Sequence, residues 1–339
     1  MIKTRLEEFS QGGYAVYRVP SMICTDKGTL IMACECRHGG DWGVMDQMIR
    51  RSFDGGKTWT DREMIYSSNG IDVINNGVLF ADGDTVHMLF AKNFRYLYYT
   101  KSTDEGETWS EPKDISYAVD CIREKYNWNW TVFAPGPGHG MVTSSGRLII
   151  PAWVVANITD INAHTPSHVT TIYSDDHGET WNSGELIYSC DGFLNPNESV
   201  LAELSDGSFM INCRHTSGSN DRKVGFSPDG ISGWHDFFNE KQLTDPVCCA
   251  GMTQGDGAIW FTNCDCTSVD GRINLKLKKS IDDGKTWSTV QEIAKFGGYS
   301  DCFYSSKLKK LFVIAEEGRT REYMFSFGLT FYSYDKNEI

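Results

Sequence analysis

The chain has 339 residues, a length that fits two average domains or one large all-β domain. With 40% hydrophobic and 23% charged residues, it has enough core-forming material to exclude a mainly disordered protein. Acidic residues outnumber basic ones by 45 to 32, and the net charge of -13 argues against nucleic acid or anionic membrane partners. An anionic ligand would therefore need a local cluster of cations.

Glycine is abundant at 33 residues against 9 prolines, and aromatic residues reach 13%, which favours short strands joined by tight turns over a helical bundle. No apolar run approaches the roughly 18 residues of a membrane span, so we expect no membrane-spanning segment. The charged start at Met1-Ile2-Lys3 differs from a signal peptide, so we expect a cytoplasmic protein. The 11 cysteines include no C-x-x-C pair, which favours reduced thiols over a zinc site or disulfides.

One pattern, S-x-D-x-G-x-T-W, recurs along the chain, and a fifth segment keeps its Ser, Asp and Trp spacing but places glycine one position early. In chain order the segments are residues 52–59, 102–109, 174–181, 227–234 (the degraded copy) and 280–287. Within the pattern, Asp can cap backbone amides, Gly can take a positive φ, and Trp can pack on a neighbouring sheet. We therefore interpret each segment as a structural hairpin turn.

The spacing of the repeats predicts the architecture. Their serines are 50, 72, 53 and 53 residues apart, as in propeller blades, and alternating stretches such as residues 273–278 flank the turns. The chain then has room for an all-β, six-bladed β-propeller of four-stranded antiparallel sheets. The 72-residue interval predicts an insertion between Val119 and Trp130. Because there is no low-complexity linker, we expect one domain over residues 1–339.

The repeat is an Asp-box, and the chain resembles the exo-α-sialidase (neuraminidase) family of six-bladed propellers. Family-like motifs occur in the family's order over nearly the whole chain. They are residues 17–20 (YRVP), 35–37 (ECR), 133–140 (FAPGPGHG), 146–152 (GRLIIPA), 197–199 (NES), 203–207 (ELSDG), 212–214 (NCR), 298–301 (GYSD) and 315–316 (AE).

The resemblance implies an arginine triad of Arg18, Arg214 and Arg272 that binds the substrate carboxylate. Arginine suits this role because its planar fork pairs bidentately with a carboxylate and does not deprotonate. In a propeller, residues far apart in sequence can reach one central pocket. Glu316 matches the family glutamate that braces the first arginine, with Glu317 as the alternative.

The resemblance also implies that Tyr299 is the nucleophile and Glu198 its base, with Glu203 the neighbour from which Glu198 must be distinguished. A neutral tyrosine avoids the repulsion that a carboxylate nucleophile would meet at a carbon bearing a carboxylate. Tyrosine, with a usual pKa of about 10, needs an adjacent base. This tyrosine is a known exception to the two-carboxylate scheme of glycosidases.

The general acid is implied to be an aspartate on the loop that follows the Glu-x-Arg motif. Asp41 has the closer spacing and lies beside Gly39 and Gly40, whereas Asp46 is the alternative. Arg37 is implied to contact the substrate carboxylate region or to position this loop.

These residues together imply a retaining exo-α-sialidase that removes terminal sialic acid from glycoconjugates through a tyrosyl intermediate. Alternatives on the same site are a trans-sialidase and a hydrolase of deaminated sialic acid, and a non-catalytic lectin is the alternative from another class. The expected partner is a sialylated glycan or free sialoside. We expect no cofactor and no metal, since the eight histidines form no recognisable ligand motif.

Overall fold

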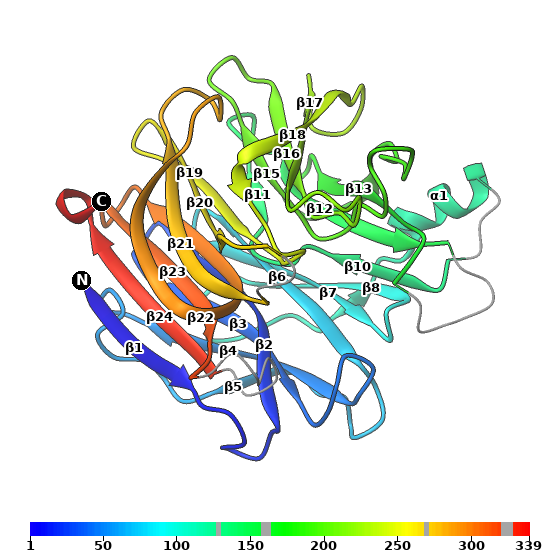
Figure 1. The fold of residues 1–339 in the computed structure, drawn as a ribbon. Helices are drawn as coiled ribbons and strands as arrows, with labels where there is room; N and C mark the ends of the chain where they lie inside the picture. Colours follow the sequence, from blue (N-terminus) through cyan, green and yellow to red (C-terminus); the bar gives the residue numbers. More distant parts are fainter. Residues whose placement is uncertain (127–129, 157–163, 268–270, 320–327) are drawn as a thin grey trace.

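The computed structural model describes residues 1–126, 130–156, 164–267, 271–319 and 328–339. Within these ranges, every pair of neighbouring strands in the sheets is antiparallel, and the helical segments are α1 (Tyr117–Tyr126) and a short 3-10 turn (Lys336–Glu338). Figure 1 shows strands over nearly the whole molecule, with α1 at one edge. The prediction of an all-β fold with antiparallel sheets is confirmed.

Three sheets have four strands joined in sequence order, as predicted for propeller blades. The first contains β2 (Val16–Cys24), β3 (Leu30–Arg37), β4 (Met45–Ser52) and β5 (Glu63–Tyr66). The second contains β6 (Ile74–Asp82), β7 (Thr85–Lys92), β8 (Tyr96–Ser102) and β9 (Lys113–Asp114). The third contains β15 (Ser199–Glu203), β16 (Phe209–Cys213), β17 (Asp221–Ser227) and β18 (His235–Thr244).

The other two sheets depart from the four-strand pattern. One has five strands, because a short strand pairs beside the main path of the sheet: β10 (Val132–Pro135), β12 (Leu148–Val155), β13 (Ser167–Ser174) and β14 (Asn182–Ser183), with β11 (Met141–Val142) on β12. The other has seven strands: β19 (Gly251–Gly255), β20 (Ala258–Cys264), β21 (Ile273–Ser280), β22 (Ser288–Ser305), β23 (Lys310–Glu317), β24 (Gly328–Asp335) and β1 (Ile2–Glu7).

The seven-stranded sheet is continuous because β22 is 18 residues long. Its first half, up to Phe296, pairs with β21, and its second half, from Gly297, pairs with β23. The first strand, β1, pairs with the last, β24, so the two ends of the chain lie in one sheet (Figure 1). The number of sheets therefore does not decide the number of blades, and six blades remain a prediction.

Contacts between sheets form a closed circuit. Strand β2 contacts β6, β6 contacts β10, β12 contacts β15, β15 contacts β19, β19 contacts β22, and β22 contacts β2. Residues distant in sequence can thus meet where the first strands of successive sheets approach one another.

The repeated turns have the chemistry that the sequence predicts. In the first, Asp54 accepts hydrogen bonds from the backbone N–H and hydroxyl of Thr58, at 2.9 and 2.7 Å. Gly56 has a φ of 90°, and a Cβ there would lie 2.2 Å from the Phe331 ring. The Trp59 ring packs on that same Phe331 of another sheet, with centroids 5.0 Å apart. The turns at Ser102, Ser174, Ser227 and Ser280 repeat the Ser–Asp bond.

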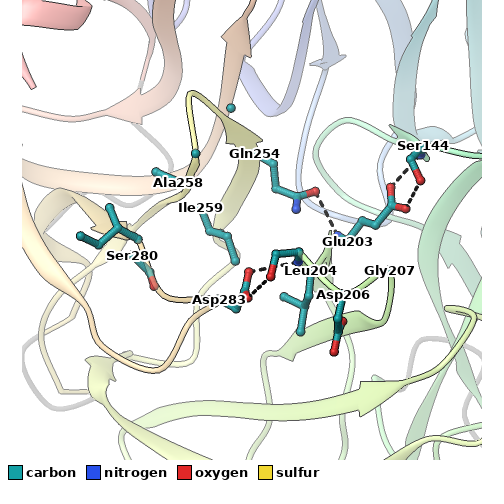
Figure 2. A pocket seen from close by; sticks show the side chains of 14 residues that line it. Ser144, Glu203, Leu204, Asp206, Gly207, Gln254, Ala258, Ile259, Ser280 and Asp283 are labelled. Atoms are coloured by element: carbon teal, nitrogen blue, oxygen red, sulfur yellow. Dashed lines mark hydrogen bonds between the residues drawn. The ribbon is translucent and has the colours of Figure 1, made fainter.

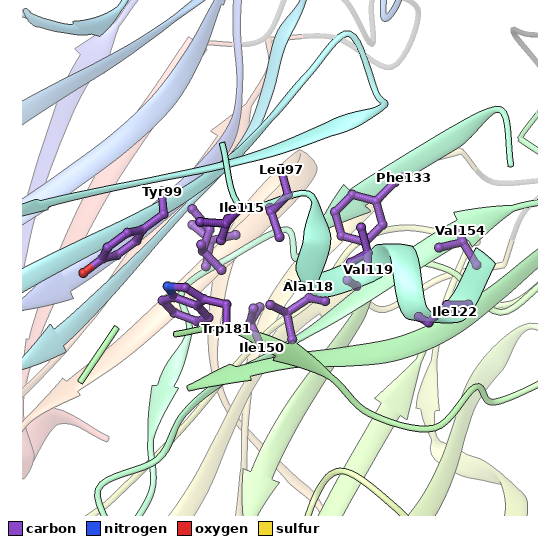
Figure 3. Close-up of a cluster of buried hydrophobic side chains, with 14 of the residues drawn as sticks. Leu97, Tyr99, Ile115, Ala118, Val119, Ile122, Phe133, Ile150, Val154 and Trp181 are labelled. Atoms are coloured by element: carbon purple, nitrogen blue, oxygen red, sulfur yellow. The ribbon is translucent and has the colours of Figure 1, made fainter. Parts of the chain in front are cut away.

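Helix α1 lies in the long interval where an insertion was predicted. Its buried face carries Ala118, Val119 and Ile122, while Asp120 in its first turn and Arg123 in its last complement the helix dipole. Figure 3 shows this face against the Trp181 ring of the third Asp-box and side chains of two sheets. The helix therefore covers apolar surface at the rim of the fold.

Candidate active site

One pocket of about 260 Å³ collects all seven residues expected to touch the substrate. They come from β2, from β22 and from segments at or beyond strand ends: Arg18, Arg37, Asp41, Glu198, Arg214, Arg272 and Tyr299. Glu316 lies directly behind this wall on β23. The seven residues selected from the sequence therefore line one pocket, although their chemical roles remain predictions.

Arg18 is held by a fully buried carboxylate. Its Nε and Nη2 donate to Glu316 Oε1 and Oε2 at 3.0 and 3.2 Å. Glu316, with 0% exposure, also accepts the backbone N–H groups of Val19 and Tyr299, at 3.1 and 3.0 Å. One carboxylate thus fixes the Arg18 guanidinium and the backbone of the two strands that carry Arg18 and Tyr299. Glu316 therefore braces both residues from behind the pocket.

Arg37 has a similar arrangement at the end of β3. Its Nε donates to buried Glu35 at 2.7 Å, and its Nη2 bonds the same carboxylate oxygen. Glu35 Oε1 accepts the Asn76 backbone N–H at 2.6 Å. The third nitrogen, Nη1, bonds Asp41 Oδ1. Arg37 therefore contacts the Asp41 loop, in agreement with one of its two predicted roles.

Asp41 lies between two cations. Its Oδ1 is 3.5 Å from Arg18 Nη1 in addition to its bond with Arg37. Burial opposes ionisation of this carboxyl, but the positive charges of Arg37 and Arg18 outweigh it and hold the pKa of Asp41 below its usual value. Asp41, held by these two arginines, is therefore ionised at neutral pH.

Tyr299 and Glu198 are in direct contact in this pocket. The Tyr299 hydroxyl donates to Glu198 Oε1 at 2.5 Å. Arg214 Nη1 bonds Glu198 Oε2 and donates to the Tyr299 hydroxyl at 2.9 Å. Burial and the charge of Glu198 raise the pKa of Tyr299, which the arginines offset only in part. The phenol is therefore neutral, with a carboxylate placed to take its proton.

The remaining arginine contacts lie over the tyrosine ring. The guanidinium carbons of Arg18 and Arg272 are 4.8 and 5.0 Å from the ring centroid of Tyr299. Among the atoms of the described ranges, Arg272 Nη1 and Arg214 Nε are buried without a hydrogen-bond partner. Buried donors left unpaired are costly. Both arginines line the pocket and give it positive charge, which suits an anionic ligand.

The three alternatives from the sequence lie elsewhere. Asp46 accepts hydrogen bonds from the Tyr14 hydroxyl and the Ser68 N–H, both at 2.6 Å. Glu203 accepts the Ser144 N–H at 2.7 Å. Glu317 accepts Lys3 Nζ at 2.8 Å and the Tyr332 hydroxyl at 2.9 Å. None of the three lines this pocket, which favours Asp41 over Asp46 and Glu198 over Glu203. Glu316 is favoured over Glu317 because it is the one that bonds the Arg18 guanidinium.

Sequence reasoning gave no role to Glu35 or to Arg222. The Glu35 position could have been found, because residues two apart on a strand share a face and Arg37 was already selected. Arg222 is fully buried and donates to Asn212 Oδ1 at 2.6 Å and to the Cys248 carbonyl at 2.7 Å. It connects the strand before Arg214 to the segment before β19, and no motif marked it.

A larger pocket of about 710 Å³ lies between β15, β19 and the turn that begins at Ser280. Figure 2 shows Glu203 bonded to Ser144 and Asp283 beside Leu204. No arginine or lysine is among its described lining residues. Its size therefore does not make it the site for an anionic sugar.

Within the described ranges, no cluster of three or more His, Cys, Asp or Glu residues has a geometry that could hold a metal ion. Over the same ranges, no helix is long and apolar enough to cross a membrane.

The chain belongs to the BNR repeat-like domain family, whose pattern it matches over residues 28–309. It is 26% identical over 320 residues to a sialidase of Bacteroides fragilis (strain YCH46), covering 82% of this chain and 55% of that protein. It is 27% identical over 312 residues to a sialidase of Micromonospora viridifaciens, covering 81% and 46%. The predicted resemblance to sialidases is thereby confirmed, and the chain spans about half the length of these two relatives.

The fold is also similar to that of solved sialidase structures. The Hadza microbial sialidase Hz136 superimposes with a TM-score of 0.81 at 22% identity, covering 100% of this chain and 69% of that one. At this level of identity, the similarity concerns the fold.

Proposed function

We propose that the protein is a retaining exo-α-sialidase that removes terminal sialic acid from glycoconjugates. The observation that carries this proposal is the Tyr299 hydroxyl 2.5 Å from Glu198, in a pocket with four arginines. A lectin would need the cations but not a tyrosine with an adjacent base. The similarity to sialidases supports the same substrate class.

In the first step, Arg18, Arg214 and Arg272 bind the carboxylate of the sugar. Glu198 takes the phenolic proton as Tyr299 Oη attacks the anomeric carbon, and Asp41 donates a proton to the departing glycosidic oxygen. The bond to the aglycone breaks as the bond to tyrosine forms. No cofactor is required, since side chains supply every proton and electron pair.

In the second step, water attacks the anomeric carbon and gives a proton to Asp41, while Tyr299 leaves and recovers its proton from Glu198. Two inversions give net retention. If another sugar hydroxyl took the place of water, the same residues would perform a trans-sialidase reaction. Sugar linkage and the N-acyl or deaminated substituent depend on the other walls of the pocket.

We further propose that residues 1–339 form a single six-bladed propeller. The closed circuit of contacts supports it, as does the division of β22 into halves that pair with different strands. In this interpretation the seven-stranded sheet comprises two blades joined through β22, and β1 completes the last blade.

The test of the mechanism is to trap the intermediate. A 3-fluorosialosyl fluoride, whose ring fluorine slows the second step, should add a sugar to the peptide that contains Tyr299, as read by mass spectrometry of a digest. Tyr299→Phe should not be labelled yet should still bind a sialic acid analogue. Labelling of another residue, or a first product of inverted configuration by NMR, would contradict the mechanism. Binding without turnover of any sialoside would favour the lectin.

A further inference from the structure

Arg18 and Arg37 each bond a buried glutamate through Nε and Nη2 of the guanidinium. In both arginines, Nη1 is the nitrogen that faces Asp41. Nε and Nη2 of Arg18 bond Glu316, and Nε and Nη2 of Arg37 bond Glu35. Nη1 of both arginines approaches a single oxygen, Asp41 Oδ1. Asp41 therefore occupies the position at which two of the pocket cations converge.

Asp41 is held less firmly than the two glutamates. Glu35 and Glu316 have 0% exposure and lie on β3 and β23, whereas the Asp41 side chain is 41% exposed and lies on the loop after β3. The loop is closed at its base by the His38 N–H bond to the Val44 carbonyl, at 3.0 Å. No heavy atom lies within 4 Å of where a Cβ of Gly39 or Gly40 would be. The loop thus has space around it.

The next residue, Trp42, packs this loop against two other residues that line the pocket. Its ring lies 4.6 Å from that of Phe94 and 5.2 Å from that of His164, centroid to centroid. His164 in turn stacks on Trp153 at 6.0 Å. Such ring contacts add to the apolar area that Trp42 buries. They favour the loop position in which Asp41 reaches the arginines.

We propose that Asp41 occupies the anion position of the ligand-free pocket, that Trp42 is the positioning residue that keeps it there, and that a ligand carboxylate must displace Asp41 to bind Arg18 and Arg37. Arg214 and Arg272, which line the same pocket, provide the other positive charges for the incoming carboxylate. After displacement, Arg18 and Arg37 bind the ligand carboxylate in place of Asp41.

This inference extends the proposed function, because a displaced Asp41 leaves the charges that favour its ionised form. An ionised carboxyl cannot donate a proton, so a general acid must change its surroundings before it acts. Carboxylate binding would therefore free Asp41 from the arginines in the same event that brings the glycosidic oxygen into the pocket.

The test uses trifluoroacetate, a simple carboxylate, titrated into the full chain and followed by ¹⁹F NMR. Asp41→Asn keeps the side-chain shape but removes the competing charge, so trifluoroacetate should bind roughly fivefold more tightly than to the wild type. Trp42→Ala should give a smaller gain, and Trp42→Phe should restore the wild-type affinity. Arg272→Ala introduced into the Asp41→Asn chain should remove the gain.

The matched control is Glu203→Gln, which makes the same change in net charge at a carboxylate of the other pocket. It should leave the affinity unchanged. Equal affinity of the wild type and Asp41→Asn, or an equal gain in Glu203→Gln, would overturn the proposal, and no gain in Trp42→Ala would overturn the role of Trp42. The same variants are then titrated with a 2,3-unsaturated sialic acid analogue. If trifluoroacetate shows the gain but no variant binds the analogue, the displacement stands and the sialidase proposal fails.

Discussion

The bracing position of Glu316 leads to a prediction in which two neighbouring glutamates should behave differently. Glu316 receives four hydrogen bonds, two from the Arg18 guanidinium and two from backbone N–H groups. Glu316→Gln keeps the size of the side chain but replaces one acceptor oxygen by a donor, so two of these four donors lose their partner. Each buried donor left unpaired costs about 1 to 3 kcal/mol, and breaking a buried ion pair costs about 3 to 5 kcal/mol.

We therefore expect Glu316→Gln to lower the free energy of unfolding by about 4 kcal/mol. For a chain of 339 residues, this corresponds to a fall in Tm of roughly 6 °C. The assay is differential scanning calorimetry, combined with titration of the sialic acid analogue, whose affinity should also fall because Arg18 loses its orientation.

The control is Glu317→Gln, one position along the same strand. Glu317 pairs with Lys3, which is 47% exposed, and such pairs contribute about 1 kcal/mol or less. The glutamine oxygen can still accept the hydrogen bond of the Tyr332 hydroxyl. Its Tm should fall by less than about 2 °C, and ligand affinity should not change. If the two variants have the same Tm and the same affinity, Glu316 has no bracing role.

Three further predictions concern single side chains. Arg272→Ala should weaken binding of the sialic acid analogue by about 1.5 to 3 kcal/mol, the range for a charged hydrogen bond, and an unchanged Kd would contradict the triad. Asp41→Ala should slow hydrolysis of sialosides with poor leaving groups far more than that of an activated aryl sialoside, and equal losses would contradict its role as acid. His168 accepts the Ser189 N–H at 2.9 Å, and burial lowers the pKa of His168 from 6.5 to about 4. Below pH 6.5 the unfolded chain binds a proton at His168 that the folded protein does not bind. The free energy of unfolding should therefore fall as the pH is lowered from 6.5 to about 4. His168→Gln should show a shallower fall in Tm over that range. A pH profile identical to that of the wild type would contradict the contribution of His168 to the loss of stability.

The turns could be predicted from sequence because their interactions are local. In the four complete Asp-boxes, the aspartate, serine, glycine and threonine that bond one another lie within eight residues, so the pattern contains nearly all of the structure. The period of the repeats then indicated the arrangement of strands. The site residues were identified from family motifs, which indicate which residues belong to the site but not how their side chains contact one another.

Other features could not be predicted because they depend on contacts between distant segments. Gly297 and Gly298 would be taken as a break between strands, yet β22 continues through them with a shift in register before Ser300. The Arg222 contacts to Asn212 and Cys248 span 10 and 26 residues and leave no local signal. The approach of Asp41 to Arg18 likewise depends on how a glycine-rich loop settles against another strand.

The pairing of β1 with β24 has a consequence for how the molecule is made. Ile2 lies opposite Ser333, so β1 leaves the ribosome long before its partner β24 has been made. Until then, the edge of β1 that will pair with β24 has unpaired backbone groups, which are prone to pair with other chains. Closing so long a loop is slow, and chains with such distant pairings are exposed to aggregation while they wait. Two charged residues of β1, Lys3 and Arg5, suit a strand that must avoid pairing with other chains until β24 is made.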